Sequence, residues 1–144
     1  MTAVVVDASA ALAWLLKSQG TRAASAFLGD ADKWAFCAPA IFSWEVHNAL
    51  LSVERRGLMS RSEHDQALGV LEALSIEIDD PTPHAGVRAQ MEFARSAGLS
   101  LFDSAYLSLG MVRNCGLASR DGNLLRVAER AGLPCHDLRD EAFQ

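Results

Sequence analysis

Short apolar segments alternate along this chain with longer segments of helical periodicity, and this alternation limits the possible folds more than any other feature. The strand-like segments are 4–6, 34–37, 75–78, 116–119 and 134–136. Helices are expected at about 8–17, 21–28, 42–56, 60–74 and 123–131, with two more beginning near 84 and 102. Apolar strands separated by helices predict a three-layer α/β fold. In it, a central twisted parallel sheet of four to five strands has helices on both faces.

Length and composition predict a single domain over residues 1–144. A chain of this length can bury one substantial core, and half of its residues are hydrophobic while 22% are charged. No apolar run reaches the ~20 residues of a membrane span. The N-terminus lacks the basic region of a secretory signal. We therefore expect a cytoplasmic protein with no membrane partner.

The cysteines and histidines do not favour a zinc site. Cys37, Cys115 and Cys135 are far apart and form no C-x-x-C pair. No two of the four histidines have the i, i+4 spacing of a helical zinc pair. We expect reduced, mostly buried thiols.

Three aspartates lie where the expected sheet would present its carboxyl edge. Asp7 directly follows the valines 4–6, Asp121 comes two residues after the segment 116–119, and Asp103 lies in the first turn of a helix. Ligands of open parallel sheets bind beyond the carboxyl ends of the strands. Each aspartate also has a structural explanation, because Asp is favoured as a helix N-cap and in a first turn.

Glu45 is the acid that helix capping does not explain. It lies inside the expected helix 42–56, beside its apolar face, with Asn48 on the same edge. A carboxylate bordering the core is costly unless a positive charge meets it. If the four acids converge, their mutual repulsion favours a hard divalent cation with oxygen ligands, and Mg²⁺ or Mn²⁺ is the expected cofactor.

The net charge of −5 argues against a protein that binds nucleic acid through its phosphates. Without the four acids the formal charge would be −1, so a metal site would account for much of this acidity. Eleven of the thirteen basic residues are arginines, which suit bidentate contacts with phosphate. Binding to nucleic acid is therefore still compatible with the composition.

Four motifs, taken in order, resemble those of the PIN-domain ribonucleases: "VVVDAS", "EVHNAL", "LFDSAYLSL" and "LASRDGNLL". The chain length and the final "RVAERAGLPC" are most similar to the VapC type, the toxin of a toxin–antitoxin pair. The resemblance covers essentially the whole chain. It implies an Mg²⁺- or Mn²⁺-dependent endoribonuclease that cleaves single-stranded RNA through metal-activated water and is neutralised by a cognate antitoxin.

The resemblance also implies roles for particular residues. Asp7, Asp103 and Asp121 match acids that bind the metal, and Glu45 matches one that acts through water. The supporting positions are Ser9, Asn48 and Ser119, the last of which is more often threonine in the family. The acid in the final turn varies in position within the family, so an N-cap role alone remains an alternative for Asp121.

RNA contacts and partner surfaces are less constrained by the sequence. The arginines that could contact RNA are Arg55, Arg56, Arg61 and Arg120, the first three of which could equally be a solvated helix end. Trp14, Trp44, Leu51 and Met111 lie off the apolar faces of their helices. We expect core positions for these four. Some of them could instead form a surface for an antitoxin or for a homodimer.

Other functions fit the residues less well. A haloacid dehalogenase-type hydrolase needs a second acid two residues after the first, where this chain has Ser9. A receiver domain needs a lysine after its last strand, and Lys17 and Lys33 both lie far from it. A catalytically inactive PIN-like module that binds RNA or protein is the alternative, but it would have no chemical reason to keep four acids.

Overall fold

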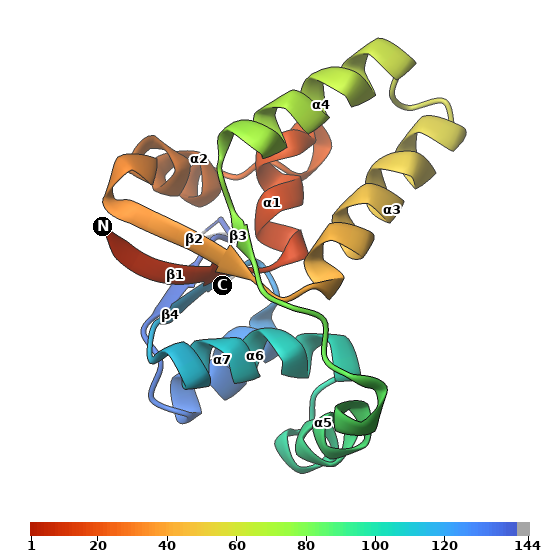
Figure 1. Cartoon of the computed structure of the whole chain (residues 1–144). Coiled ribbons are helices and arrows are strands. Elements are labelled where there is room, and N and C mark those ends of the chain that lie inside the picture. Colours follow the sequence, from red (N-terminus) through yellow and green to blue (C-terminus); the bar gives the residue numbers. More distant parts are fainter. Residues whose placement is uncertain (141–144) are drawn as a thin grey trace.

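A parallel five-stranded sheet forms the middle layer of this computed structural model, which describes residues 1–140 (Figure 1). Residues 141–144, the end of the range expected for the domain, lie outside the described residues. The strand order is β3-β2-β1-β4-β5. The strands are β1 (Thr2–Val6), β2 (Trp34–Ala38), β3 (Glu77–Ile78), β4 (Gly116–Ser119) and β5 (Cys135–Asp137).

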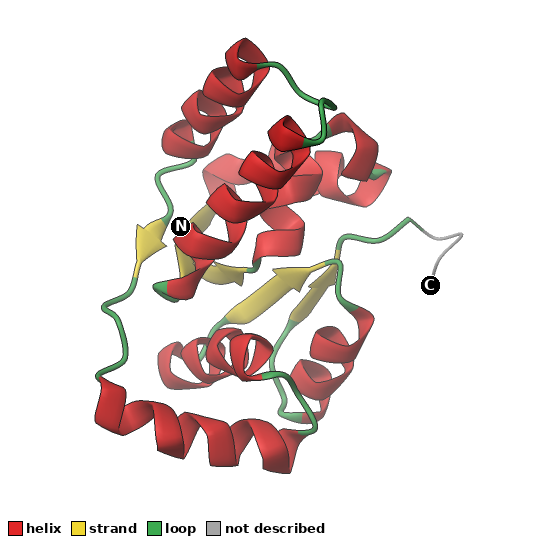
Figure 2. Ribbon diagram, turned by 90° about the vertical axis from the view of Figure 1, so that its right-hand side faces the viewer, coloured by secondary structure: helices red, strands yellow, loops and turns green. Residues whose placement is uncertain are grey.

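Helices cover both faces of the sheet, which confirms the predicted three-layer α/β fold (Figure 2). On one side lie α1 (Ala8–Leu15), α2 (Arg22–Gly29), α3 (Ile41–Arg55) and α4 (Arg61–Ala73). On the other side lie α5 (His84–Ala97), α6 (Leu101–Arg113) and α7 (Gly122–Arg130). Two short 3₁₀ helices, η1 (Lys17–Gln19) and η2 (Ala31–Lys33), flank α2. Among the described residues, no helix has both the length and the apolar character that crossing a membrane requires.

The central position of β1 follows from its sequence. Val4, Val5 and Val6 are fully buried between the two helical layers. β1 pairs with β2 on one side and with β4 on the other, so its residues contact core on both faces and strand backbone on both edges. Asp7, which follows β1, therefore lies at the middle of the carboxyl edge of the sheet.

The hairpin of α3 and α4 has clear local signals at its turn. Gly57, just after α3, adopts a positive φ of 75°, which a residue with a side chain rarely does. Ser60 then caps α4: its hydroxyl accepts from the backbone N–H of Glu63, while the Glu63 carboxylate accepts from the backbone N–H of Ser60. The two residues form a capping box, as the spacing of a serine three residues before a glutamate predicts.

Two local expectations are wrong. The strand expected at 75–78 is only two residues long, because Ser75 adopts a left-handed φ of 51° and prolongs the turn after α4. On α6, Phe102 and Val112 are exposed, although their helical spacing from Tyr106 and Leu109 predicts that all four share one apolar face. The buried face is instead centred on Gly110, where an added Cβ would lie 2.8 Å from Leu133 Cδ1.

The large apolar residues that lie off the apolar faces of their helices fall into a packed group and an exposed group. Trp14 packs against Phe27 and Phe36, with ring centroids 6.4 and 5.7 Å away, and its indole N–H donates to the Ala24 carbonyl. The core expectation is correct for Trp14. It is wrong for Trp44 and Met111, which are exposed.

Candidate functional site

Asp7 lies at the carboxyl end of β1 and is only 4% exposed. Its Oδ1 accepts from the backbone N–H of Ala10 at 2.9 Å, so Asp7 is the N-cap of α1. The Ser9 hydroxyl donates to the same oxygen at 2.7 Å, and the Ser119 hydroxyl donates to Oδ2. The N-cap interpretation is thus correct, and two further donors fix the carboxylate.

The same two serines connect the loops that follow β1 and β4. The Ser9 hydroxyl accepts from the backbone N–H of Arg120 at 2.9 Å. The Ser119 hydroxyl accepts from the backbone N–H of Asp121 at 2.8 Å. Each serine therefore donates to Asp7 and accepts from the loop after β4, which fixes Asp121 relative to Asp7.

Burial dominates the electrostatics of Asp7. It raises the pKa of this carboxyl to about 6, against the hydrogen bonds from Ser119, Ala10 and Ser9, and the charge of Asp121 raises it further. No ion pair formed among residues 1–140 includes Asp7. The ionised carboxylate is therefore buried without a compensating cation.

Asp103 lies in the first turn of α6, whose N-cap is Ser100. Burial raises the pKa of Asp103 to about 6, and the next largest cause is the charge of Asp121, followed by that of Asp7. Glu45 raises it as well. Four acids from four separate segments therefore lie near enough to repel one another at the carboxyl edge of the sheet.

Glu45 is directed by a hydrogen bond that the sequence did not reveal. The buried hydroxyl of Tyr106 donates to Glu45 Oε1 at 2.6 Å. Burial raises the pKa of Tyr106, and the hydrogen bond to Glu45 raises it further, so the phenol stays protonated and acts as a donor. The sequence places Tyr106 one turn after Asp103 on the same helix, a spacing that could have indicated a shared site.

Asp121 caps α7 with a single oxygen. Its Oδ1 accepts from the backbone N–H groups of Asn123 at 3.0 Å and Leu124 at 3.2 Å. The N-cap interpretation is therefore correct for Asp121, as it is for Asp7. Capping does not remove its charge, which is felt at both Asp103 and Asp7.

The chemistry of these donors fits a hard divalent cation. All four candidate side chains are carboxylates, and oxygen is the ligand that Mg²⁺ and Mn²⁺ prefer. Their mutual repulsion is the kind of instability that a bound cation removes. Among residues 1–140, however, no group of three or more His, Cys, Asp or Glu side chains has a spacing that could hold a metal ion. The fit of the donor set to the ion therefore rests on its chemistry and charge and not on the present spacing of the side chains.

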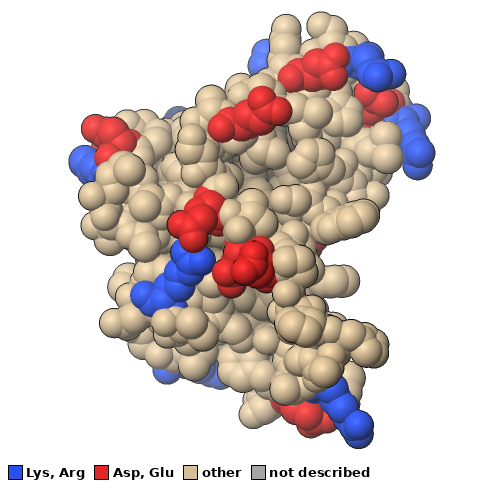
Figure 3. All heavy atoms as spheres, viewed as in Figure 1, with Lys and Arg blue, Asp and Glu red and all other residues tan. Residues whose placement is uncertain are grey.

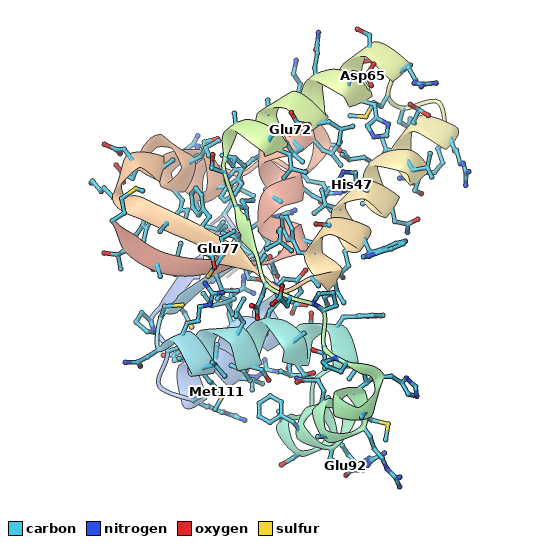
Figure 4. All side chains as sticks on the ribbon, in the orientation of Figure 1. His47, Asp65, Glu72, Glu77, Glu92 and Met111 are labelled. Carbon is cyan, nitrogen blue, oxygen red and sulfur yellow. The ribbon has the colours of Figure 1, made fainter. Side chains whose placement is uncertain are left out.

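Other residues expected at the site lie elsewhere. Asn48 is exposed and lines a shallow surface on α3 together with Trp44 and His47. Of these residues, Figure 4 labels His47. Arg55 follows Glu45 by ten residues, so it lies about 15 Å further along α3. Arg56 follows the end of α3 and Arg61 begins α4, so both lie at the same distant end of the hairpin. The fold therefore places these three arginines away from the four acids.

Arg120 is the exception among the predicted arginines, because its backbone is part of the serine network. Its Nη1 donates to Gln19 Oε1 at 3.3 Å. Its Nε is buried and has no hydrogen-bond partner among the described residues. The side chain thus lies beside the site and is directed toward η1.

An apolar groove opens next to the acids, between α3, α6 and the loop after β3. It has a volume of about 360 Å³, and its lining includes Pro39, Ile41, Trp44, Pro81, Val87 and Val112. Trp44 is 82% exposed and Val112 is 83% exposed. Figure 3 shows the face seen in Figure 1, where small groups of charged side chains are separated by wide uncharged areas. We refer to this feature as the Trp44 groove.

Comparisons with known proteins agree on the fold. The family model described as the PIN domain matches residues 4–130. PAE2754 from Pyrobaculum aerophilum is similar in structure, with a TM-score of 0.66, 20% identity, and coverage of 93% of this chain and 89% of that one. FitAcB from Neisseria gonorrhoeae has a TM-score of 0.59 and 16% identity, with coverage of 93% and 96%. At these identities the two structures show the fold alone. The search of curated protein sequences gave no match.

Proposed function

Because the chain belongs to the PIN-domain family, whose members are generally nucleases, we propose that it is a metal-dependent endoribonuclease acting on single-stranded RNA. The main support is the convergence of Asp7, Glu45, Asp103 and Asp121 at one edge of the sheet, where the charges of the other three acids all raise the pKa of Asp103. A group of mutually repelling carboxylates, of which Asp7 is buried and the other three are partly exposed, is costly for stability without a cation. A metal-binding function accounts for that cost.

We assign the metal-binding role to Asp7, Asp103 and Asp121, with Glu45 acting through water. When bound, Mg²⁺ or Mn²⁺ would lower the pKa of the attacking water and polarise the scissile phosphate. Ser9 and Ser119 hold the Asp7 carboxylate in one orientation. Tyr106 holds Glu45, so that its carboxylate can orient water and accept a proton from it.

We further propose that the chain is of the VapC toxin type and acts in the cytoplasm as a single domain, held inactive by a small cognate antitoxin. The support is the order of the four motifs and the similarity of the last helix to that type. The match of the PIN family model over residues 4–130 is consistent with one domain.

We also propose a homodimer, with a second copy of the chain on the Trp44 groove. Two large apolar side chains that are both more than four-fifths exposed flank this groove. Such a patch is costly in a monomer. A twofold contact would bury Trp44 of each protomer against the groove of the other.

The nuclease proposal is tested with purified chain free of antitoxin. It is incubated with mixed single-stranded RNA and Mg²⁺ or Mn²⁺, beside Asp7→Asn and Asp65→Asn. Asp65 is an exposed acid on α4 (Figure 4), so Asp65→Asn removes the same charge away from the site. We expect a loss of about 100-fold or more for Asp7→Asn and little change for the control.

Equal cleavage by wild type and Asp7→Asn would contradict the proposal, as would cleavage that survives EDTA. If wild type and Asp7→Asn both bind RNA without cleaving it, the protein is an inactive binding module of the same fold.

A further inference from the structure

Phe102 is an exposed aromatic residue at the border of the acid site. It directly precedes Asp103 in the first turn of α6 and is 56% exposed. Tyr106 follows it by four residues, so the two rings lie on the same side of the helix. The Tyr106 hydroxyl is the donor to Glu45. Phe102 therefore lies one turn closer to the start of α6 than Tyr106, on the side of the helix that meets Glu45.

The first turn of α6, to which Phe102 belongs, is held in place by side chains from two elements. The Ser100 hydroxyl accepts from the backbone N–H of Asp103 at 3.0 Å and so caps the helix. Gln90 of α5 donates through Nε2 to the hydroxyl of the buried Ser104 at 3.0 Å. The backbone of Phe102 is therefore fixed relative to Asp103. A ring on such a support loses little entropy when it binds a partner, because only its two side-chain dihedrals are free.

The Phe102 ring has no aromatic partner within residues 1–140. The ring pairs formed there connect Trp14, Phe27, Trp34, Phe36 and His136. Phe102 is also absent from the lining of the Trp44 groove, so the second copy proposed for that groove is not placed against it. The first turn of a helix favours acidic residues over apolar ones. Helix formation and core packing therefore do not explain an aromatic ring at this position.

The charges around the site offer an RNA strand few cations. The four acids repel phosphates unless a metal ion neutralises them. Three of the four arginines predicted to contact RNA lie at the distant end of the α3–α4 hairpin, and Arg120 is directed toward η1. Binding through the bases avoids this repulsion, and unpaired bases of RNA stack on aromatic side chains. Phe102 provides such a ring directly before Asp103.

We propose that Phe102 stacks on an unpaired base next to the scissile phosphate. The contact positions the strand over the acids. It also makes binding selective for single-stranded over duplex RNA, because the faces of paired bases are covered by their neighbours. This inference rests on the proposed ribonuclease function and names the part of the substrate that the site recognises. Phe102 is a positioning residue, and the acids perform the chemistry.

The test measures binding of a fluorescein-labelled single-stranded oligoribonucleotide by fluorescence anisotropy, with Ca²⁺ in place of Mg²⁺. We expect Phe102→Ala to weaken binding about tenfold, a typical effect of removing one stacking side chain. Phe102→Tyr keeps the flat ring and should bind within about twofold of wild type, whereas Phe102→Leu keeps only the apolar bulk and should bind nearly as weakly as the alanine variant. The slope of log K against log salt should not change, because stacking releases no counterions.

Met111→Ala is the matched control. Met111 is an exposed apolar residue of the same helix (Figure 4), nine residues after Phe102 and therefore about 13 Å further along α6. Its removal should not change RNA binding. Phe102→Ala should also keep the wild-type increase of the melting temperature with Mg²⁺, because it leaves the acids in place. Loss of that increase would mean that the ring acts on Asp103 and not on RNA, and would overturn the inference.

An RNA that lacks one base identifies the stacking partner. Once the cleaved bond of a short oligoribonucleotide has been mapped, the nucleotides on either side of it are replaced one at a time by abasic residues. We expect one replacement to weaken wild-type binding about tenfold and to have no further effect on Phe102→Ala, because the ring and the base form one contact. A duplex of the same RNA should bind wild type more weakly than the single strand does, and Phe102→Ala should reduce that difference.

Steady-state cleavage with Mg²⁺ separates positioning from chemistry. We expect Phe102→Ala to raise KM about tenfold and to leave kcat within about twofold, because the stack forms before the bond breaks. Wild-type affinity in Phe102→Ala, or additive effects of this variant and every abasic replacement, would overturn the inference while wild-type cleavage upholds the nuclease. Weaker self-association of Phe102→Ala in sedimentation, with unchanged RNA binding, would overturn it in favour of a contact between copies of the chain. A wild-type chain that neither binds nor cleaves RNA would overturn both proposals.

Discussion

At the scale of single residues, Tyr106 matters because it directs Glu45. Its hydroxyl is buried and donates at 2.6 Å to a carboxylate. Hydrogen bonds to charged groups contribute about 1.5–3 kcal/mol to stability. Removing the hydroxyl would also leave the Glu45 carboxylate free to rotate away from the other acids.

We therefore expect Tyr106→Phe to destabilise the fold by about 1–2 kcal/mol in urea denaturation and to lower kcat about tenfold. A double-mutant cycle with Glu45→Ala, which removes the acceptor of this hydrogen bond, is the control. The two stability changes should be clearly non-additive, because both variants remove the same contact. Additive changes would mean that the hydroxyl acts on something other than Glu45.

The positions of the four acids could be predicted from the sequence, because three of them follow from strand ends and helix starts. Asp7 and Asp121 are N-caps of the kind expected. Glu45 could be singled out because no capping role exists inside a helix. That these acids bind a metal remains a prediction, since their convergence shows charge and proximity only.

The contacts of Tyr106 and Asn48 could not be predicted. Periodicity places a residue on a helix face but does not say which atom of another helix it meets. Tyr106 belongs to an apolar face, so its hydroxyl gave no separate signal. Asn48 shares a helical edge with Glu45, yet α3 turns that edge partly outward and leaves Asn48 exposed.

At the scale of secondary-structure elements, α3 is unusual because it has two apolar faces. One is buried through Phe42, Val46 and Leu50. The other is the outward face with Trp44 and Leu51, which nothing within residues 1–140 covers fully. A helix with this distribution is suited to packing against a second molecule.

We expect wild type to sediment as a dimer and Trp44→Ala to weaken dimerisation by about 2 kcal/mol, because a buried tryptophan is a common interface hot spot. Leu58→Ala is the matched control, since Leu58 is exposed beyond the end of α3, away from the groove. Analytical ultracentrifugation measures both. A monomeric wild type, or an equal effect of the two substitutions, would exclude the Trp44 groove as the dimer surface.

Most elements could be predicted because their signals are local. The capping box of Ser60 and Glu63 and the glycine at 57 define the hairpin of α3 and α4 without any tertiary information. The buried face of α6 could not be predicted from the sequence, because it depends on the close approach of Gly110 to Leu133, which lies in another part of the chain. That approach rotates Phe102 and Val112 into solvent, where an apolar pattern predicts core.

At the scale of the whole molecule, the acid site lowers the stability of the metal-free fold at neutral pH. The pKa of Asp7 is about 6 in the folded chain and 3.8 in the reference state. Between these values the folded state binds more protons than the unfolded state, so this contribution to stability falls as the pH rises from about 4 to 6. A shift of this size corresponds to about 3 kcal/mol at pH 7. Asp103 acts in the same direction.

We therefore expect Asp7→Asn to gain stability relative to wild type, in EDTA, as the pH rises from 4 to 7. The difference between the two proteins is the useful quantity, because His136, whose pKa is lowered by burial, acts in the opposite direction in both. Urea denaturation across this pH range measures it. A constant difference would show that Asp7 titrates normally.

Mg²⁺ provides the complementary measurement. At pH 7 it should raise the melting temperature of wild type and leave Asp7→Asn nearly unchanged, because ligand binding stabilises only a fold that holds the ion. Stabilisation of both proteins to the same degree would place the ion elsewhere.

The hydrogen bond between Ser119 and Asp7 joins residues that are 112 positions apart in the sequence. During translation, Asp7 leaves the ribosome long before β4 exists, and it lacks this donor until nearly the whole chain has been made. A nascent or truncated chain that ends before residue 116 also lacks the strand that pairs with one edge of β1. Ser119 is therefore the last of the hydrogen-bond donors of Asp7 to be synthesised, within the last fifth of the chain, so the carboxylate is fixed only when synthesis is almost complete.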